Sequence, residues 1–521
     1  MRFALVHSIV LKRLLWLWLV PLLVGCVPAV TDPPRHANQA AAAEQPAILS
    51  GEPVDLPAPT PTPGGPQIAD ANSDNQTGSV HPVITIWINE TSTAHAQIVN
   101  QLVDSFNASH DWHVEALLVT PKLLPQLVRT AAISDTLPDL IMHPVEYSLG
   151  WAYGGILDVA AATEVISQLG RETFEPGALE LVQFESGLQA AVPQDGWQQL
   201  LIYRSDWFAA RDLAPPDNYA AIMAAAQAII EPDTIISGLV VPTESDLIST
   251  HQVFEQIALA NGCELVSSEG EVTFFTPACL EALEFYREII NEHSPIGVQT
   301  DTSALNAYLS GRTGFIVGSP RILPQLAGLD PVVQAGCPEC STPDYLAQNS
   351  GFVTVITGSG NLATRARFSE LTYWGITRQA DRAGVEQFLE YWYNEAYLEW
   401  LAVNPERKVP MRRGNSVDNG HFYRAWRQLP VVPGGPTLET IYGTALVDQI
   451  SQDVAQSNRW GLPEQGELIA TVYENLTFSI LVQEMLTGYF NSSQSVVEGY
   501  LRVVGLIPDY PFAMQVTASE E

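Results

Sequence analysis

The chain has 521 residues, 46% of them hydrophobic, and this length favours two or more compact lobes that each bury a core. Its 24 lysines and arginines are outnumbered by 58 aspartates and glutamates, which gives a formal net charge of −34 at pH 7. A surface this acidic repels phosphate backbones, so we expect no nucleic-acid partner.

The N-terminus has the pattern of a secretory signal. Arg2, Lys12 and Arg13 precede an apolar run at 14–24 that is too short to span a bilayer. The run leads into Leu23-Val24-Gly25-Cys26, which resembles a bacterial lipobox, the motif whose cysteine is acylated after cleavage. We therefore predict a lipoprotein signal peptide at 1–26 and an extracytoplasmic protein held at the cell membrane by a lipid on Cys26. An ordinary secretory signal with a chance cysteine is the alternative.

Residues 27–80 are rich in proline, alanine and threonine and show no apolar periodicity. Such a composition cannot bury enough apolar surface to offset the entropy lost on ordering. We predict a disordered tether that separates the folded part from the membrane.

Four cysteines follow the lipobox, and outside the cytoplasm an even number favours disulfides. The local pairing of Cys263 with Cys279 would staple a hairpin that ends in a helix. Cys337 and Cys340 form a CxxC motif, for which we favour a disulfide that closes a loop; a redox motif or half of a zinc site is the alternative. No second CxxC and no Cys-His cluster lies nearby, so we predict no metal site and no cofactor.

Alternating strand and helix patterns begin at residue 83. β-branched residues at 83–88 indicate a buried strand, and Ala94, Ile98, Leu102 and Phe106 then recur as on one face of a helix. The same reasoning predicts strands at 114–119 and 137–142, a helix at 123–133 between them, and C-terminal helices at 438–457, 467–486 and 495–504. Strand-helix alternation indicates an α/β fold with a parallel sheet.

Several segments resemble, in order, those of family 1 extracellular solute-binding proteins, the group that contains maltose-binding protein. The opening matches are Phe106-Asn107-Ala108-Ser109-His110, Leu137-Pro138-Asp139-Leu140-Ile141 and Gly154-Gly155-Ile156-Leu157-Asp158. Later matches lie at 190–193, 200–208, 281–286, 308–315, 350–356 and 486–489, so the resemblance covers about residues 82–505. Arg204 stands where the family has asparagine, and Asn218 and Tyr219 depart from its Pro-x-Thr-Trp helix start.

The resemblance implies an α/β, two-lobed periplasmic-binding-protein-like (type II) fold with a ligand cleft between the lobes. Carried onto this chain, lobe 1 comprises 82–195 plus 350–408, lobe 2 comprises 196–349 plus 409–505, and 506–521 form a tail. It also implies a monomer that captures a small solute, a sugar or oligosaccharide, and delivers it to the permease subunits of an ABC transporter. Because Arg204 and the segment at 215–219 depart from the family pattern, peptides, polyols and phosphorylated compounds are alternative solutes.

A sugar presents flat C–H faces and a rim of hydroxyls, so aromatic rings beside carboxylates, amides or guanidinium groups suit it. Polar and aromatic residues after strands, or at the expected lobe crossovers, are our candidate ligand contacts. They are Asn89, Glu90, Glu146, Tyr147, Asp195, Trp197, Ser319, Arg321, Gly351, Trp374, Trp460 and Tyr473. For the strand-end residues the alternative is a solvated turn, and for Trp197 it is a hinge residue that packs on one lobe.

We expect no catalytic residues. The chain has no G-x-S-x-G elbow and no H-E-x-x-H motif. A lipid-anchored polysaccharide hydrolase is the rival from another class, because 58 acidic residues also supply carboxylate pairs. A ligand-binding subunit of a sensor is the second rival.

Overall fold

The computed structural model describes residues 81–231, 233, 235–267, 269–461 and 465–508. The predicted signal peptide with Cys26, the tether at 27–80 and most of the tail at 506–521 lie outside the described residues. No helix among the described residues is long and apolar enough to cross a membrane.

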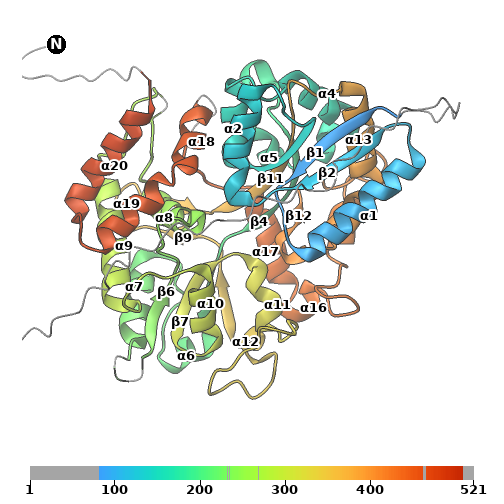
Figure 1. Ribbon diagram of the computed structural model, residues 1–521. Coiled ribbons are helices and arrows are strands. Elements are labelled where there is room, and N and C mark those ends of the chain that lie inside the picture. Colours follow the sequence, from blue (N-terminus) through green and yellow to red (C-terminus); the bar gives the residue numbers. More distant parts are fainter. Residues whose placement is uncertain (1–80, 232, 234, 268, 462–464, 509–521) are drawn as a thin grey trace, which may run out of the picture. The chain divides into compact units, whose positions relative to one another are not determined.

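A six-stranded sheet contains the N-terminal strands (Figure 1) and has the order β12-β4-β11-β3-β1-β2. Its strands are β1 (Val83–Ile88), β2 (His113–Leu118), β3 (Leu140–Pro144), β4 (Val192–Gln198), β11 (Ser369–Ile376) and β12 (Val409–Pro410). β1 pairs in parallel with β2 and β3, whereas β11 runs antiparallel to β3 and β4. The sheet is therefore mixed, and the parallel pairing expected from the sequence is limited to β1, β2 and β3.

The helices of this part are α1 (Thr93–Ser109), α2 (Leu124–Ser134), α3 (Val145–Tyr153), α4 (Val159–Leu169), α5 (Pro176–Glu180), α13 (Arg382–Tyr391), a π-helical turn (Trp392–Ala396) and α14 (Tyr397–Leu401). α1 shows how the sequence forms them. The Ser92 side chain caps the helix by accepting a hydrogen bond from the backbone N–H of His95 at 3.2 Å. Its apolar face ends at Phe106, whose ring lies 5.3 Å from that of Phe388 on α13.

The second sheet has four strands in the order β6-β7-β5-β8. They are β5 (Leu200–Arg204), β6 (Ser237–Val240), β7 (Thr313–Gly318) and β8 (Ser350–Val353). Its helices are α6 (Ser205–Ala210), α7 (Tyr219–Ile229), α8 (Ile248–Ala260), α9 (Pro277–His293), α10 (Asp301–Leu309), α11 (Leu323–Leu326) and α12 (Tyr345–Gln348). A separate antiparallel pair consists of β9 (Ile356–Thr357) and β10 (Arg365–Ala366).

The chain changes sheet at points that differ from the expected lobe boundaries. β4 continues to Gln198 in the first sheet, and Gln199 alone separates it from β5 in the second. Residues 350–353, expected in lobe 1, pair with β5, and residues 409–410, expected in lobe 2, pair with β4. Backbone pairing therefore moves 196–198 and 409–410 to the first sheet and 350–353 to the second.

The C-terminal helices are α15 (His421–Trp426), α16 (Leu438–Tyr442), α17 (Thr444–Val454), α18 (Gly466–Glu474), α19 (Thr477–Leu486) and α20 (Ser492–Leu506). Short 3-10 turns occur at Pro121–Leu123, Arg171–Thr173, Glu185–Gly187, Pro320–Ile322 and Pro405–Arg407. α17 packs on β4 and α18 on α3 of the first sheet, while α19 and α20 pack on α8 and α9. The expected helices at 438–457 and 467–486 are each broken, at Gly443 (φ 82°) and Leu476 (φ 51°).

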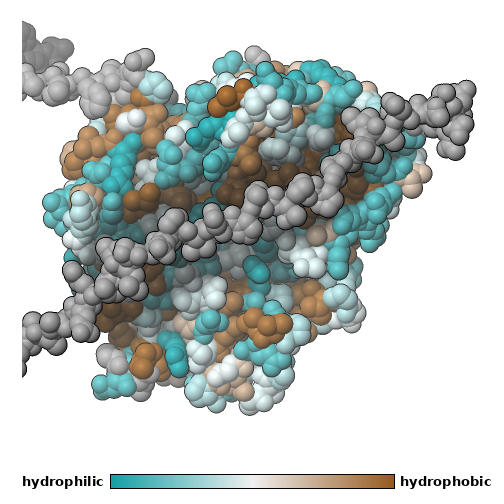
Figure 2. Space-filling model, viewed as in Figure 1, coloured by the Kyte–Doolittle hydropathy of each residue, from teal (hydrophilic) through white to brown (hydrophobic). Residues whose placement is uncertain are grey.

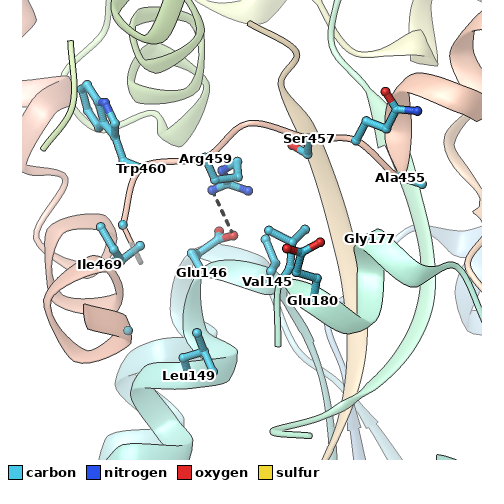
Figure 3. A pocket seen from close by; sticks show the side chains of 14 residues that line it. Val145, Glu146, Leu149, Gly177, Glu180, Ala455, Ser457, Arg459, Trp460 and Ile469 are labelled. Carbon is cyan, nitrogen blue, oxygen red and sulfur yellow. Dashed lines mark ion pairs between the residues drawn. The ribbon is translucent and has the colours of Figure 1, made fainter. Parts of the chain in front are cut away.

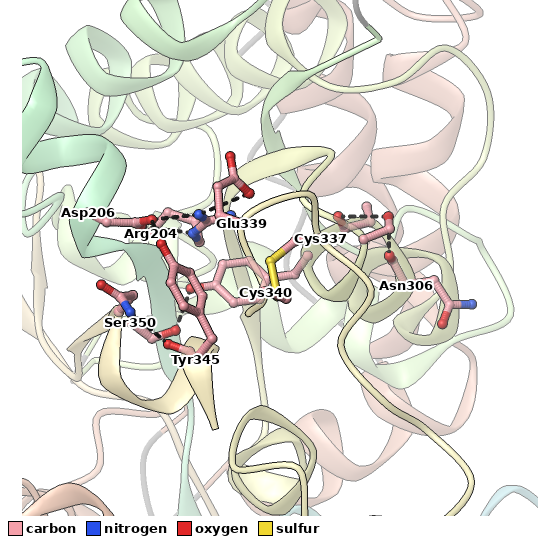
Figure 4. The surroundings of a disulfide bond; sticks show 12 residues. Arg204, Asp206, Asn306, Cys337, Glu339, Cys340, Tyr345 and Ser350 are labelled. Atoms are coloured by element: carbon pink, nitrogen blue, oxygen red, sulfur yellow. Dashed lines mark hydrogen bonds and ion pairs between the residues drawn. A yellow bond between two sulfur atoms is a disulfide. The ribbon is translucent and has the colours of Figure 1, made fainter. Parts of the chain in front are cut away.

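Both cysteine pairs are disulfide-bonded, Cys263 with Cys279 and Cys337 with Cys340. The second bond closes the loop that carries Glu339, whose carboxylate lies 3.5 Å from the buried guanidinium of Arg204 (Figure 4). That guanidinium also donates two hydrogen bonds to Asp206, at 2.9 and 2.6 Å. Arg204 is therefore a buried structural cation at the end of β5. On the face shown in Figure 2, hydrophilic and hydrophobic residues are interspersed.

Candidate functional site

One edge of the six-stranded sheet faces the second sheet. β1 and β3 are parallel and end at this edge. β11 is antiparallel to β3 and to β4, so β11 begins at this edge and β4 ends there before the chain enters β5. In open α/β sheets ligands bind at the carboxyl ends of the parallel strands. The polar, charged and aromatic residues along this edge include Asn89, Glu90, Glu146, Trp197, Glu370, Arg407 and Lys408.

Arg459 is the centre of one group of side chains at this edge, which we call the Arg459 group: Glu146, Glu255, Glu370, Arg459 and Tyr473. The guanidinium of Arg459 lies 3.2 Å from Glu255 on α8 and donates a hydrogen bond to the Tyr473 hydroxyl at 2.7 Å. Tyr473 in turn donates to Glu255 at 2.6 Å. Only 7% of the Arg459 side chain is exposed. Glu255 is thus a fully paired buried carboxylate.

Glu146, in the first turn of α3, is paired poorly by comparison. Its nearest cation is Arg459, at 3.6 Å, and 1% of its side chain is exposed. Neither carboxylate oxygen has a hydrogen-bond partner among the described residues. Burial raises the pKa of Glu146 above its ordinary value, against the opposing effect of Arg459.

Glu370, at the start of β11, joins the two sheets. It accepts a hydrogen bond of 2.5 Å from the side-chain amide of Gln252 on α8. Burial, and then the neighbouring charge of Glu146, raise the pKa of Glu370 to about 8. The carboxyl groups of Glu146 and Glu370 therefore disfavour each other's charge, and Arg459 and Arg407 offset part of this effect on Glu370.

A cavity of about 520 Å³ opens beside the Arg459 group (Figure 3). It lies between α3 and α5 on one side and the segment 455–461 with the start of α18 on the other. Glu146 and Arg459 point toward one another within it, and Trp460 and Glu180 also line it. A second cavity, of about 780 Å³, shares Arg459 and Gly461 with the first and extends toward the Cys263–Cys279 disulfide. In the second cavity burial raises the pKa of Glu264 to about 7.

The close packing of α3 against α18 fixes the wall of the first cavity. A Cβ atom placed on Gly150 would lie 2.6 Å from the Cβ of Ala470, and one on Gly466 would lie 2.2 Å from the Cβ of Leu149. Only glycine permits such an approach of two helix backbones. Glu146 is therefore held on a rigid pair of helices.

A second group, which we call the Lys408 group, consists of Asp195, Trp400 and Lys408. The indole N–H of Trp400 donates to Asp195 at 2.7 Å, and the Lys408 ammonium donates to the Trp400 carbonyl at 3.0 Å. The same ammonium lies 3.5 Å from the centroid of the Trp400 ring. Burial raises the pKa of Asp195 to about 6 and lowers that of Lys408 to about 7.

The family model for bacterial extracellular solute-binding proteins matches residues 101–404, more than half of the chain. The chain belongs to this family. Among curated relatives it is 26% identical over 288 residues to the Escherichia coli protein YcjN, a periplasmic-binding protein of an ABC transporter by name. That match spans 55% of this chain and 63% of YcjN, less than two thirds of the relative's length.

Solved solute-binding proteins share the two-lobed fold. The acarbose-binding receptor GacH of Streptomyces glaucescens gives a TM-score of 0.61 at 16% identity, over 83% of this chain and all of GacH (100%). Maltose-bound MalE3 of T. maritima gives 0.60 at 17%, over 82% and 100%. A ribitol-bound solute-binding protein of Agrobacterium radiobacter K84 gives 0.59 at 14%, over 82% and 99%. The type II periplasmic-binding-protein-like α/β fold expected from the sequence is confirmed.

In this solute-binding protein the structure brings some of the expected contacts together. Glu146 and Trp460 both line the first cavity, and Tyr473 bonds to Arg459. Other expected contacts at this edge lie near the Lys408 group instead. Glu90 lies 3.5 Å from the ring of His95, and Arg407 lies 5.9 Å from the centroid of the half-buried Trp197 ring. Asn89 and Ser319 are half-buried, Arg321 is exposed, and Asp195 is held by Trp400.

Three expected contacts pack inside the protein instead. Trp374 is fully buried, with its ring 5.3 Å from that of Trp392 in the first core. Tyr147 is 2% exposed and stacks on Trp151 at 5.1 Å. Gly351 lies within β8, where any Cβ would fall 2.1 Å from the ring of Tyr203. A position after or within a strand does not reveal which way a side chain points: Trp374 and Tyr147 point into packed interiors, and Gly351 has no side chain to offer.

Sequence reasoning missed Arg459, Glu255 and Glu370. Arg459 precedes the candidate Trp460, but its partners Glu146 and Glu255 lie more than two hundred residues earlier in the chain. Glu370 has a signal that could have been used, because it opens a strand at the edge that faces the second sheet.

Proposed function

We propose that this protein is the substrate-binding lipoprotein of an ABC importer and captures a sugar or oligosaccharide at the edge between its two sheets. One observation carries the proposal: a cavity at that edge contains a buried carboxylate, Glu146, whose oxygens lack hydrogen-bond partners among the described residues, beside a buried arginine. Buried polar groups left without protein partners are typical of sites that a ligand completes.

The chemistry of the edge suits a hydroxyl-rich solute. Carboxylates accept hydrogen bonds from hydroxyls, and the guanidinium groups of Arg407 and Arg459 donate to them. The half-buried ring of Trp197 offers apolar surface for a sugar face. The acarbose, maltose and ribitol bound by proteins of the same fold support this class of solute.

Capture proceeds by a population shift between an open and a closed arrangement of the two sheets. Gln199 is the single residue between β4 and β5 and forms part of the hinge. Lys122 lies 2.6 Å from Asp246 and Gln252 donates to Glu370, contacts that a closed arrangement would retain. The solute supplies the differential free energy because it contacts both sides only when they are together. No bond of the solute is broken in this scheme.

Delivery completes the proposed role. A lipid on Cys26 anchors the protein outside the cytoplasm, the segment 27–80 gives it reach, and the closed monomer docks on the permease subunits of the transporter.

Thermal-shift and titration experiments with neutral sugars and polyols test the proposal. At least one should raise the melting temperature and bind one-to-one, and chromatography should recover it unchanged. Trp197→Ala should weaken that binding about three- to tenfold without lowering the melting temperature of the ligand-free protein. The absence of binding across the panel, or cleavage of a bound sugar, would contradict the proposed function.

A further inference from the structure

Among the described residues, the carboxyl groups around Arg459 outnumber the cations within ion-pair distance of them. Glu146, Glu255 and Glu370 surround Arg459, and Glu180 lines the mouth of the same cavity. We propose that the solute presents a protonated amine, as an amino sugar does, and that Glu146 binds this amine inside the cavity. The inference rests on the proposed function and narrows its class of solute.

Arg459 does not hydrogen-bond to Glu146, and three of its five N–H groups bond to other acceptors. Its guanidinium pairs with Glu255 at 3.2 Å, donates to the Tyr473 hydroxyl at 2.7 Å and donates to the backbone carbonyl of Ser369 at 3.3 Å. The distance of 3.6 Å to Glu146 is too long for a hydrogen bond. Glu146 thus retains two buried oxygens that have no hydrogen-bond partner among the described residues.

The other titratable groups around Glu146 add no positive charge. His251 lies 3.2 Å from Glu255, but burial lowers its pKa and keeps the ring neutral. The phenol of Tyr147 is neutral as well, because burial raises its pKa further. Glu370 adds a further carboxyl group, which accepts a hydrogen bond from the side-chain amide of Gln252. Among the described residues no cation other than Arg459 lies within ion-pair distance of Glu146, so a bound ammonium group would add the hydrogen-bonding partner that its oxygens lack.

An ammonium group suits the carboxylate of Glu146 better than a metal ion does. It carries three donors, enough to bond both oxygens of Glu146 and a third acceptor. A divalent cation needs several acidic or histidine ligands arranged around one point, and no such group of three occurs among the described residues. Leu149 and Ile469 provide an apolar wall against which a sugar ring can lie.

Matched sugars that differ at one substituent test the inference. Calorimetric titrations would compare glucosamine, N-acetylglucosamine and glucose, and the corresponding β-1,4-linked disaccharides. The amine-bearing member of a set should bind at least about tenfold more tightly than its neutral counterparts. If neutral sugars bind equally well or better, the amine inference is wrong and the proposed function stands. If no sugar binds, the proposed function fails too.

Variants locate the amine at Glu146. Glu146→Gln should abolish the preference for the amine and change the affinity for neutral sugars less than about threefold. Glu164→Gln on the exposed surface of α4 is the matched control and should keep the preference. Glu180→Gln, at the cavity mouth, should reduce the preference about two- to threefold and serves if Glu146→Gln does not fold. A preference that survives both substitutions would overturn the assignment.

Discussion

The Lys408 group and the Arg459 group lie at the same edge of the same sheet, yet they differ in whether each buried charge has hydrogen-bond partners. In the Lys408 group, Asp195 and Lys408 each bond to Trp400, so both buried charges have hydrogen-bonded partners. In the Arg459 group, Glu255 is equally well bonded, but Glu146 is not.

This difference distinguishes residues that stabilise the fold from residues that bind a ligand. A buried charge whose partners come from the protein fixes local geometry, and its loss destabilises the fold. A buried charge without such partners lowers stability and remains only where something else completes it. We therefore expect substitutions in the Lys408 group to reduce stability and the Glu146 substitution to reduce binding.

The largest effect should come from Lys408→Met. It leaves Asp195 buried without its cation and removes the contact with the Trp400 ring, so the free energy of unfolding should fall by about 3–5 kcal/mol. Urea unfolding followed by tryptophan fluorescence measures the change. Lys122→Met, which removes an exposed ion pair with Asp246, is the control and should cost less than about 1 kcal/mol. Equal effects of the two substitutions would remove the basis of the comparison.

Glu255→Gln should have the next largest effect. The variant keeps the shape of the side chain but weakens its bonds to Arg459 and Tyr473, which should lower the free energy of unfolding by about 1.5–3 kcal/mol. The same urea titration measures it. A loss smaller than that of Glu146→Gln would show that the two carboxylates have been assigned the wrong roles.

Glu146→Gln should have the smallest effect on stability and one of opposite sign. Removing a buried carboxylate without hydrogen bonds should leave the free energy of unfolding unchanged or raise it by up to about 1 kcal/mol. Calorimetric melting of the ligand-free variant beside Glu164→Gln checks this. A clear loss of stability would mean that Glu146 is a structural residue.

The stability of the folded protein should depend on pH through the raised pKa of Glu370. Its pKa is about 8 in the folded protein and about 4.5 when unfolded, so the folded state holds the proton more tightly. Stability from this group is complete below the unfolded pKa and is lost as pH rises toward 8. Melting temperatures between pH 4.5 and 8.5 should fall less steeply in Glu370→Gln than in the wild type; identical slopes would exclude a raised pKa.

Local sequence patterns predicted much of the fold. They did not predict which buried charged groups have hydrogen-bond partners. The β-branched run at 83–88 is β1, and the four-residue spacing that ends at Phe106 lies within α1. The positions at which helices break were harder to predict. Gly443 could have been recognised as one, but Leu476 adopts a left-handed conformation that leucine rarely takes, so the apolar periodicity continued across it.

The candidate site was predictable only where it depends on strand ends. Glu146 follows β3, and its position at the edge follows from the alternation of strands and helices. Whether the Glu146 oxygens receive hydrogen bonds depends on Arg459, which is distant in sequence. Whether a tryptophan side chain lines a cavity or packs in a core also depends on contacts with residues that are distant in sequence. Trp374 and Trp460 could not be told apart for this reason.

Hydrogen exchange of the full chain, with and without a saturating sugar from the panel, tests most directly where the solute binds. We predict slower amide exchange in α3 and in residues 455–461 when the sugar is bound, because these segments enclose the cavity at Glu146. Saturable binding that leaves exchange in both segments unchanged would contradict the account.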